Sequence, residues 1–339
     1  MQHNVEINGK QLSLQERALA FDMQHRPASS AVVDFALQPD GKRRHPERAI
    51  DAGVLIEQFK SDPIGTLSYG REAVFAISHD NRLSVGERAE RSERYLNAYL
   101  GLTLKLDREA FPPSKHSEVQ QGTPAYLPDG FVDMGSSPEV DPVKRSREMI
   151  ALDKADLFRR YRNDIRGFFT NDAIVHMSKA DRDRRLAAQI ARSTYFQLPY
   201  NIMAAEEAAG GHIRLSELDQ AVCRHLALMY QALCQVTGVE SRLLKNDFSE
   251  KVNGTWTRPE PHGANMVKLD DGWYLMDPTQ PDIETTTQGK IWKPGAFPID
   301  GPPAPGAVQV EYKGTLPHSG REKRYIFRNN CYWQIAKTA

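Results

Sequence analysis

The chain has 339 residues, of which 40% are hydrophobic and 26% are charged, and its 44 basic side chains balance 44 acidic ones. A chain of this length and apolar content can bury a core and accommodates two domains. The charge balance excludes a global attraction to nucleic acid or to an anionic membrane surface, so neither is expected as a partner, although a local basic patch stays open. No run approaches the roughly 18 apolar residues that span a bilayer, and no membrane span is predicted.

The cysteines and the N-terminus bear on the compartment. Cys223, Cys234 and Cys331 are too few and too scattered for a disulfide framework or a paired-cysteine zinc site, so no metal is expected. Residues 1–10 lack the charged lead and apolar run of a secretory signal. Together these features predict a reducing compartment, either the bacterial cytoplasm or, after export by a non-Sec route, a host cytosol.

Residues 1–110 are predicted to form a mostly helical, polar region. Two capping-box patterns, Ser13–Glu16 and Ser84–Glu87, open helices expected over residues 14–23 and to about residue 102. A further helix is expected over residues 49–59.

Residues 111–142 interleave prolines with glycine and serine. This composition opposes regular structure and predicts either a linker between two domains or an ordered loop lying across the second one. The second domain is then expected over residues 143–339.

The second domain is predicted to be helical first and β-rich afterwards. Helices are expected over residues 143–168, 179–194, 199–209 and 216–236. Strands are expected over residues 240–245, 264–269, 273–276, 308–312 and 324–335, with a polar loop over 246–261. Helices followed by antiparallel strands indicate an α+β fold.

Three residues in this domain have the chemistry of a thiol nucleophile, its base and the orienter of that base. Cys223 opens an apolar helix, His262 opens an apolar strand and Asp277 ends the next strand. A helix N-terminus and an imidazolium both lower the pKa of a thiol and so favour the reactive thiolate. The first effect requires a helix that begins at Asp219 or later, because a start at Ser216 would place the thiol two turns inside.

The spacing of His262 and Asp277 leaves their contact open. If Asp271 and Gly272 formed a tight two-residue turn, Asp277 would face Met266 instead of His262. The contact therefore requires a wider or bulged turn, or a strand that bends back at His262.

Residues 216–279 resemble the core of the transglutaminase-like superfamily of papain-type cysteine enzymes. The matching pieces are Cys-Arg-His at 223–225, a strand entered through Gly-Val at 238–239, His262, and Trp-x-x-x-Asp-Pro-Thr at 273–279. The resemblance implies a catalytic helix packed on an antiparallel sheet and a triad of Cys223, His262 and Asp277. It also implies acyl transfer from an amide of a protein or peptide substrate, without a cofactor. Members include cross-linkers, deamidases, proteases, peptide N-glycanases and some bacterial effectors, so the substrate stays open; we favour a protein glutamine side chain.

The chain departs from this pattern around the nucleophile and the base. Many members have glycine two residues before the cysteine, where this chain has Ala221, and an aromatic residue shortly after the histidine. All four tryptophans follow Cys223, so none can precede it as an oxyanion donor. The expected donors are the Cys223 N–H and a second group, for which Gln197 or Asn201 is the candidate. Arg224 and His225 are candidate cleft residues.

Two other interpretations stay open. Cys223 shares a helical stripe with Leu226, Tyr230 and Cys234, so it also fits a small buried hydrophobic residue. The protein would then be a non-catalytic protein-binding module on the same fold. Alternatively, the N-terminal region carries the function and the second domain supports it. The oligomeric state is not predicted.

Overall fold

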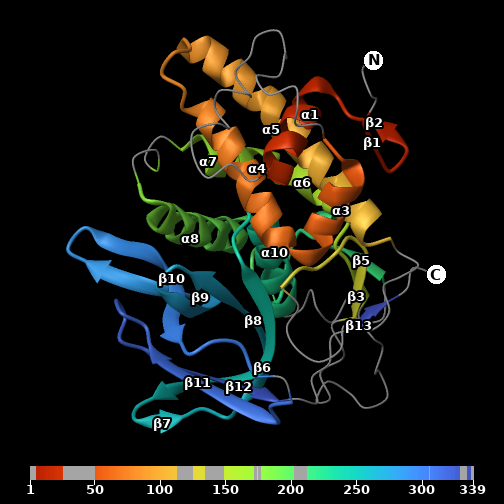
Figure 1. Ribbon diagram of the computed structural model, residues 1–339. Helices are drawn as coiled ribbons and strands as arrows, with labels where there is room; N and C mark the ends of the chain where they lie inside the picture. Colours follow the sequence, from red (N-terminus) through yellow and green to blue (C-terminus); the bar gives the residue numbers. More distant parts are fainter. Residues whose placement is uncertain are drawn as a thin grey trace. The chain divides into compact units, whose positions relative to one another are not determined.

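The computed structural model describes residues 5–25, 50–112, 125–133, 149–171, 174, 177–201, 212–304, 306–328 and 334–336 (Figure 1). Over these residues the chain forms eight α-helices, a large antiparallel sheet and two smaller sheets, so the expected mixture of helices and antiparallel strands is observed. No helix in these ranges is long and apolar enough to cross a membrane. Cys331, most of the proline-rich stretch and the predicted helix beyond Asn201 lie outside them.

Residue contacts divide the chain into two compact units. The helical unit comprises Met1–Pro113, Lys154–Met177 and Gln235–Val239, and the sheet unit comprises Ser114–Asp153, Ser178–Cys234 and Glu240–Ala339. Their composition differs from the predicted division at residues 110 and 143, because two helices after the proline-rich stretch pack with the N-terminal helices.

The helical unit contains a short hairpin and, within its described residues, six helices. These elements are β1 (Glu6–Ile7), β2 (Lys10–Gln11), α1 (Leu14–His25), α3 (Ala52–Ser61), α4 (Pro63–Ser78), α5 (Val85–Ala110), α6 (Lys154–Arg160) and α7 (Arg162–Thr170). Both capping boxes are confirmed: the Ser13 N–H donates to Glu16 over 2.7 Å, and the Ser84 N–H donates to Glu87 over 2.9 Å. Helix α4 was not predicted, although its N-cap Asp62, followed by proline at the first helical position, signals it.

The single helix predicted over residues 143–168 is confirmed only in its later part, as α6 and α7, and is wrong at its start. Met149–Ala151 forms strand β4, which pairs with β3 (Phe131–Asp133) and β5 (His212–Arg214). Strand partners far apart in the sequence therefore override the local helical pattern here. Strand β3 lies within the stretch predicted to be a linker or an ordered loop.

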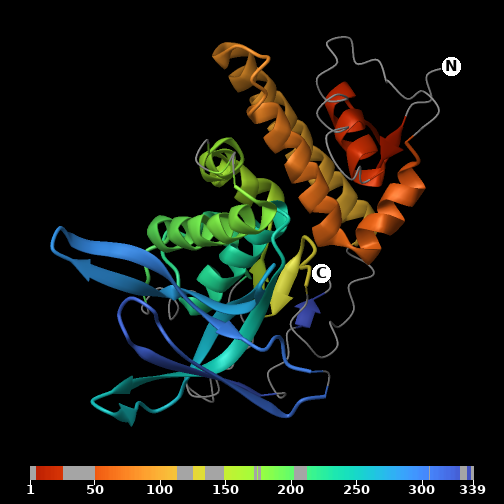
Figure 2. The ribbon, with the colours of Figure 1, turned by 60° about the vertical axis from the view of Figure 1, so that its left-hand side comes forward.

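The sheet unit is built on an antiparallel sheet with the strand order β10-β9-β8-β6-β12-β11, and β7 pairs with β6 (Figures 1 and 2). Its strands are β6 (Ser241–Val252), β7 (Thr255–Trp256), β8 (Glu260–Leu269), β9 (Gly272–Thr286), β10 (Gly289–Ile299), β11 (Gln309–Thr315) and β12 (Glu322–Arg328). A smaller sheet has the order β13-β3-β4-β5, with β13 at Gln334–Ala336. The predicted pairing of residues 264–269 with 273–276 is confirmed.

Two helices of this unit, α8 (Lys179–Gln197) and α10 (Cys223–Val236), lie against the sheet. The Tyr230 hydroxyl on α10 donates to the Ala187 carbonyl on α8 over 3.3 Å. The buried Asn265 amide on β8 donates to the Ala227 carbonyl on α10 over 3.1 Å. These contacts hold α10 beside α8 and against β8.

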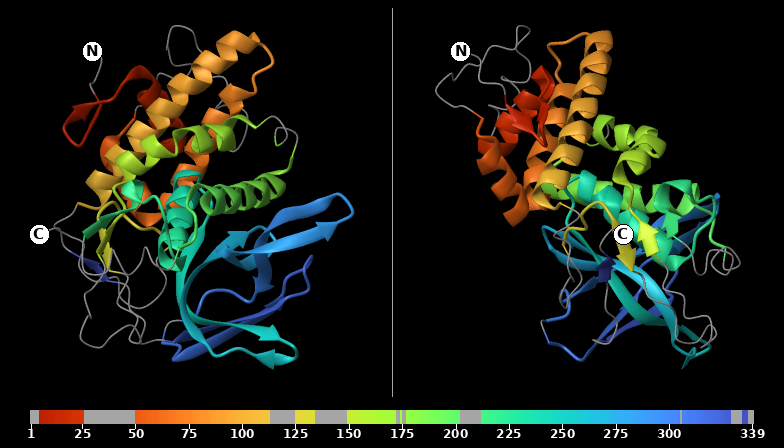
Figure 3. Two further views of the ribbon diagram at one scale, coloured as in Figure 1. Left: turned by 180° about the vertical axis from the view of Figure 1, so that it is seen from behind. Right: turned by 90° about the vertical axis from the view of Figure 1, so that its right-hand side faces the viewer.

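The large sheet is curled (Figure 3), and apolar side chains pack together on its inner face. Six of its strands and one loop contribute buried side chains, namely Leu244, Ala264, Met266, Leu275, Phe297, Tyr312, Leu316, Tyr325 and Phe327. At Gly314 of β11 a methyl group would overlap the Phe297 ring of β10. Glycine at this position therefore allows the curled sheet to bring β11 against β10.

The polar loop predicted over residues 246–261 is wrong for most of its length. Strand β6 continues to Val252, and Val252 pairs with Thr255 across Asn253 and Gly254. Both of these residues have positive φ, at 50° and 82°, as a tight two-residue hairpin turn requires. Asn-Gly was the available sequence signal for this hairpin.

Candidate functional site

Cys223 is the first residue of α10, which begins later than predicted. Leu215–Glu217 forms only a 3₁₀ turn, because the Ser216 side chain and N–H bond to Asp153 instead of capping a helix. The chain then runs extended beside residues 199–201: the Ala221 N–H donates to the Pro199 carbonyl over 3.0 Å, and the Asn201 N–H donates to the Ala221 carbonyl over 2.9 Å. The predicted start at Ser216 is wrong, and Cys223 lies at the positive end of the helix dipole.

His225 stabilises this helix start. Its buried ring accepts the Val222 N–H through Nδ1 over 3.3 Å, in the manner of a residue that caps the first turn. The ring therefore fixes the turn that carries Cys223.

The register of β8 and β9 brings His262 and Asp277 to the same face of the sheet. The turn lies at Asp270–Asp271, one residue earlier than the tight turn considered above, with Leu269 opposite Gly272 and Asn265 opposite Met276. Continuing this register places Asp277 opposite Ala264, with His262 two residues along on the same face. His262 Nε2 lies 2.7 Å from Asp277 Oδ2, and the two side chains are 8% and 0% exposed.

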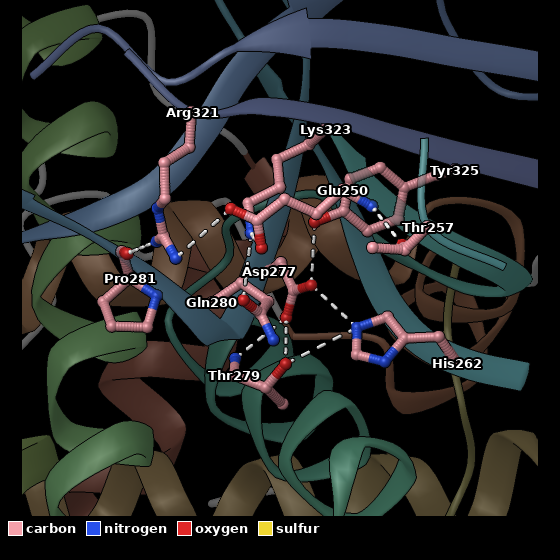
Figure 4. Close-up of polar contacts among 10 residues, drawn as sticks. All are labelled: Glu250, Thr257, His262, Asp277, Thr279, Gln280, Pro281, Arg321, Lys323 and Tyr325. Carbon is pink, nitrogen blue, oxygen red and sulfur yellow. Dashed lines mark hydrogen bonds and ion pairs between the residues drawn. The ribbon is translucent and has the colours of Figure 1, made fainter. Parts of the chain in front are cut away.

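A bulge in β9 shapes the backbone after Asp277. Gly295 of β10 pairs with Asp277 and Lys293 pairs with Asp282, so several β9 residues loop out opposite a short stretch of β10. Within the bulge, Thr279 folds back and donates to Asp277 Oδ1 through its N–H over 2.9 Å and its hydroxyl over 2.6 Å (Figure 4). A methyl group at Gly295 would overlap the Gln280 carbonyl, so this bulge requires a glycine opposite it.

Aromatic side chains enclose the imidazole and the carboxylate. The His262 ring lies 5.1 Å from Phe248 and 6.1 Å from Tyr325, measured between ring centroids. The Tyr325 hydroxyl donates to Asp277 Oδ2 over 2.8 Å, as Figure 4 shows. The fully buried Asp277 carboxylate therefore accepts four hydrogen bonds.

The charges of Cys223, His262 and Asp277 shift one another's pKa values toward the ionised forms. Burial alone would raise the pKa of Cys223, but the His262 charge, hydrogen bonds from His262 and the Gly263 backbone, and the Arg224 charge lower it below its ordinary value. Burial alone would lower the pKa of His262, but the charges of Asp277 and Cys223 and their hydrogen bonds raise it to about 10. Burial opposes ionisation of Asp277 as well, yet His262 and Thr279 hold its pKa below the usual range. The arrangement favours thiolate, imidazolium and carboxylate together.

Gly263 follows His262 at the point where β8 lies close to the start of α10. A methyl group at this position would lie 3.1 Å from the Arg224 Cα atom, which is closer than ordinary van der Waals contact. The Gly263 N–H also contributes a hydrogen bond to Cys223. Glycine after His262 thus lets β8 approach the start of α10.

The other predicted residues have different environments. Gln197 is exposed at the end of α8, and the Asn201 amide donates to the Gln220 side chain. Arg224 is partly buried and contributes its charge to the lowered pKa of Cys223. Cys234 is fully buried, and burial raises the pKa of its thiol to about 12, so its reactivity should contrast with that of Cys223.

Sequence reasoning missed Tyr200, which was assigned to a helix. It forms a parallel bridge with Ala221, and its side chain is 48% exposed. Burial, followed by the charges of Cys223 and Asp277, raises the pKa of its hydroxyl to about 12. No sequence motif marks this residue, because the bridge depends on pairing with a distant segment.

In the part of the chain that the structure describes, no group of three or more His, Cys, Asp or Glu side chains is arranged to hold a metal ion. No protein-family model matches the chain, and no curated protein matches it. Among solved structures the chain is similar to a "Putative Cysteine Protease from Cytophaga hutchinsonii", with 14% identity, 57% of this chain and 67% of that chain covered, and a TM-score of 0.21. A similarity this low carries no argument about fold or function.

Proposed function

We propose that the protein is a cysteine enzyme that transfers an acyl group from an amide, with Cys223 as nucleophile, His262 as acid and base, and Asp277 as the residue that orients and stabilises the imidazolium. One observation carries the proposal: the thiol at the first position of α10 lies near enough to His262 for the imidazolium charge to lower the pKa of the thiol, and His262 Nε2 lies 2.7 Å from the buried Asp277 carboxylate. Since Nε2 faces Asp277, Nδ1 is the nitrogen that exchanges a proton with the Cys223 thiol. A helix packed on an antiparallel sheet that carries the histidine and the acid also fits a papain-like core.

The reaction divides into acylation and deacylation. The Cys223 thiolate attacks the carbonyl carbon, a C–S bond forms, and the carbonyl oxygen becomes an oxyanion. The His262 imidazolium then gives its proton to the leaving nitrogen, the C–N bond breaks, and a thioester remains. Water or an amine attacks the thioester, His262 takes its proton, and the thiolate leaves.

The oxyanion needs donors close to Cys223. The backbone N–H of Cys223 points out of the helix N-terminus, where the first amides have no acceptor within the helix. Gln197 and Asn201 remain the proposed second donors, and the Tyr200 hydroxyl is a third candidate because it stays protonated over the working range of the thiolate.

The proposed substrate is a protein glutamine side chain. Attack on its carboxamide releases ammonia, after which water gives deamidation and an amine gives a cross-link; attack on a peptide bond would instead cleave the chain. All three reactions use the same thioester, so the acceptor and leaving group must be measured.

The test is to incubate the enzyme with dimethylcasein, with and without a fluorescent primary amine, and to follow ammonia release, amine incorporation and chain cleavage. We expect at least one product, lost in Cys223→Ala and retained in Cys234→Ala. If neither wild type nor Cys234→Ala forms a product, and Cys223 forms no adduct with an acyl-donor electrophile, the protein is better described as a binding module.

A further inference from the structure

One oxygen of the Asp277 carboxylate accepts two side-chain donors. Oδ2 lies 2.7 Å from His262 Nε2 and 2.8 Å from the Tyr325 hydroxyl, and both rings are buried. Oδ1 accepts the Thr279 N–H and hydroxyl, and the Thr279 Oγ1 atom also lies 3.5 Å from His262 Nε2. The carboxylate is therefore oriented by Thr279 even without Tyr325, and Tyr325 shares Oδ2 with His262.

Tyr325 comes from a strand outside the segment that resembles the enzyme family. It lies on β12, and Lys323 lies two residues before it, on the same face of that strand. The Lys323 ammonium donates to Gln280 over 3.1 Å and to Glu250 over 2.8 Å. Strand β12 therefore contacts both the acid and the bulge that follows it, as Figure 4 shows.

The Tyr325 hydroxyl remains a donor at any working pH. Burial, together with the neighbouring Asp277 charge, raises its pKa well above the ordinary value. A neutral hydroxyl on Oδ2 withdraws negative charge from the oxygen that stabilises the imidazolium.

We propose that Tyr325 moderates the charge of Asp277: its hydroxyl shares Oδ2 with His262, so that the imidazolium is stabilised enough to form but can still give its proton to a leaving group. This role rests on the proposed function, in which His262 acts as an acid in acylation. Tyr325 does not touch the reacting atoms and acts only through Asp277.

The neighbouring strand supplies a matched control. Tyr312 on β11 is the direct cross-strand partner of Tyr325, is buried in the same core, and donates its hydroxyl to the Gly301 carbonyl over 2.8 Å. Tyr312→Phe and Tyr325→Phe each remove one hydroxyl and one hydrogen bond. Only the second removes a donor from Asp277.

The experiment follows the titration of His262 by NMR in histidine-labelled full-length protein, with the resonance assigned by His262→Gln. Other titratable groups around His262 and its partners are Cys223 on α10, Glu250 on β6, Lys323 on β12, and Tyr200. All of them are unchanged in both variants. We expect the pKa of His262 to rise by about half to one unit in Tyr325→Phe, and to stay within about 0.2 units of the wild-type value in Tyr312→Phe.

A second variant tests the opposite sign. Replacing Tyr325 with 3-fluorotyrosine keeps the ring and makes the hydroxyl a stronger donor, so the pKa of His262 should fall. This variant also tests the proposal if Tyr325→Phe does not fold. An unchanged or lowered value in Tyr325→Phe, or no fall with 3-fluorotyrosine, overturns the proposal. Failure of the proposed function is visible separately, as an ordinary Cys223 thiol in the wild type.

Discussion

Asp277→Asn tests how much of the imidazolium's stability comes from the buried carboxylate. Interactions within the site raise the pKa of His262 from 6.5 to about 10 against the effect of burial, and the Asp277 charge is the largest of the raising causes. At roughly 1.4 kcal/mol per pKa unit, the difference corresponds to about 5 kcal/mol. If Asp277 supplies about half of it, the asparagine variant should lower the pKa of His262 by about 2 units while keeping an oxygen acceptor in place.

The assay is the NMR titration of His262 in both proteins, together with the rate of Cys223 alkylation at pH 7. Lowering the pKa of His262 by about 2 units moves the proton equilibrium between the Cys223 thiol and the imidazole about a hundredfold toward the neutral pair, so alkylation at pH 7 should slow. Asp271→Asn is the matched control, since Asp271 lies in the turn of the same hairpin and bonds Arg184 and Tyr274 instead. A pKa of His262 that stays within about half a unit of the wild type in Asp277→Asn would refute this reasoning.

Three further substitutions test residues that surround the site. Gly295→Ala should destabilise the protein by about 1–3 kcal/mol and slow Cys223 alkylation, because the added methyl group displaces the bulge after Asp277. Gly86→Ala is the control, because a methyl group there meets no neighbour. Equal urea midpoints for Gly295→Ala and the wild type would contradict this role of Gly295. His225→Ala should lower the free energy of unfolding by about 1 kcal/mol by leaving the Val222 N–H unpaired, and unchanged thermal unfolding would contradict a capping role. Tyr200→Phe should leave the pH dependence of Cys223 alkylation nearly unchanged but reduce acyl transfer by about tenfold if its hydroxyl binds the oxyanion; equal turnover would remove it as a donor.

Local sequence patterns predicted the elements that depend on nearby residues. The capping boxes at Ser13 and Ser84 and the β8–β9 pairing require only contacts within a few residues, and all three were confirmed. Cys223, His262 and Asp277 were predicted as a triad from the resemblance of residues 216–279, and the register of the hairpin accounts for the contact between His262 and Asp277.

The missed features depend on distant partners. Ser216 has the form of a helix cap, but its side chain bonds to Asp153 and Ala221 pairs beside Tyr200, so α10 begins at Cys223. Strand β4 has a helical pattern in its neighbourhood but pairs with β3 and β5. Tyr325 reaches Asp277 from a strand 48 residues away, and no spacing rule in the motif could indicate it.

The most direct test of the account is the rate of Cys223 alkylation by iodoacetamide against pH, in wild type and in His262→Ala, with the buried Cys234 as the internal reference. A thiolate–imidazolium pair predicts a reactive plateau that extends below pH ~7 in the wild type and disappears in the variant, leaving an ordinary thiol titration near pH ~8.5. The same ordinary titration in both proteins, or no reaction of Cys223 at all, would contradict a thiolate–imidazolium pair and with it the proposed enzyme.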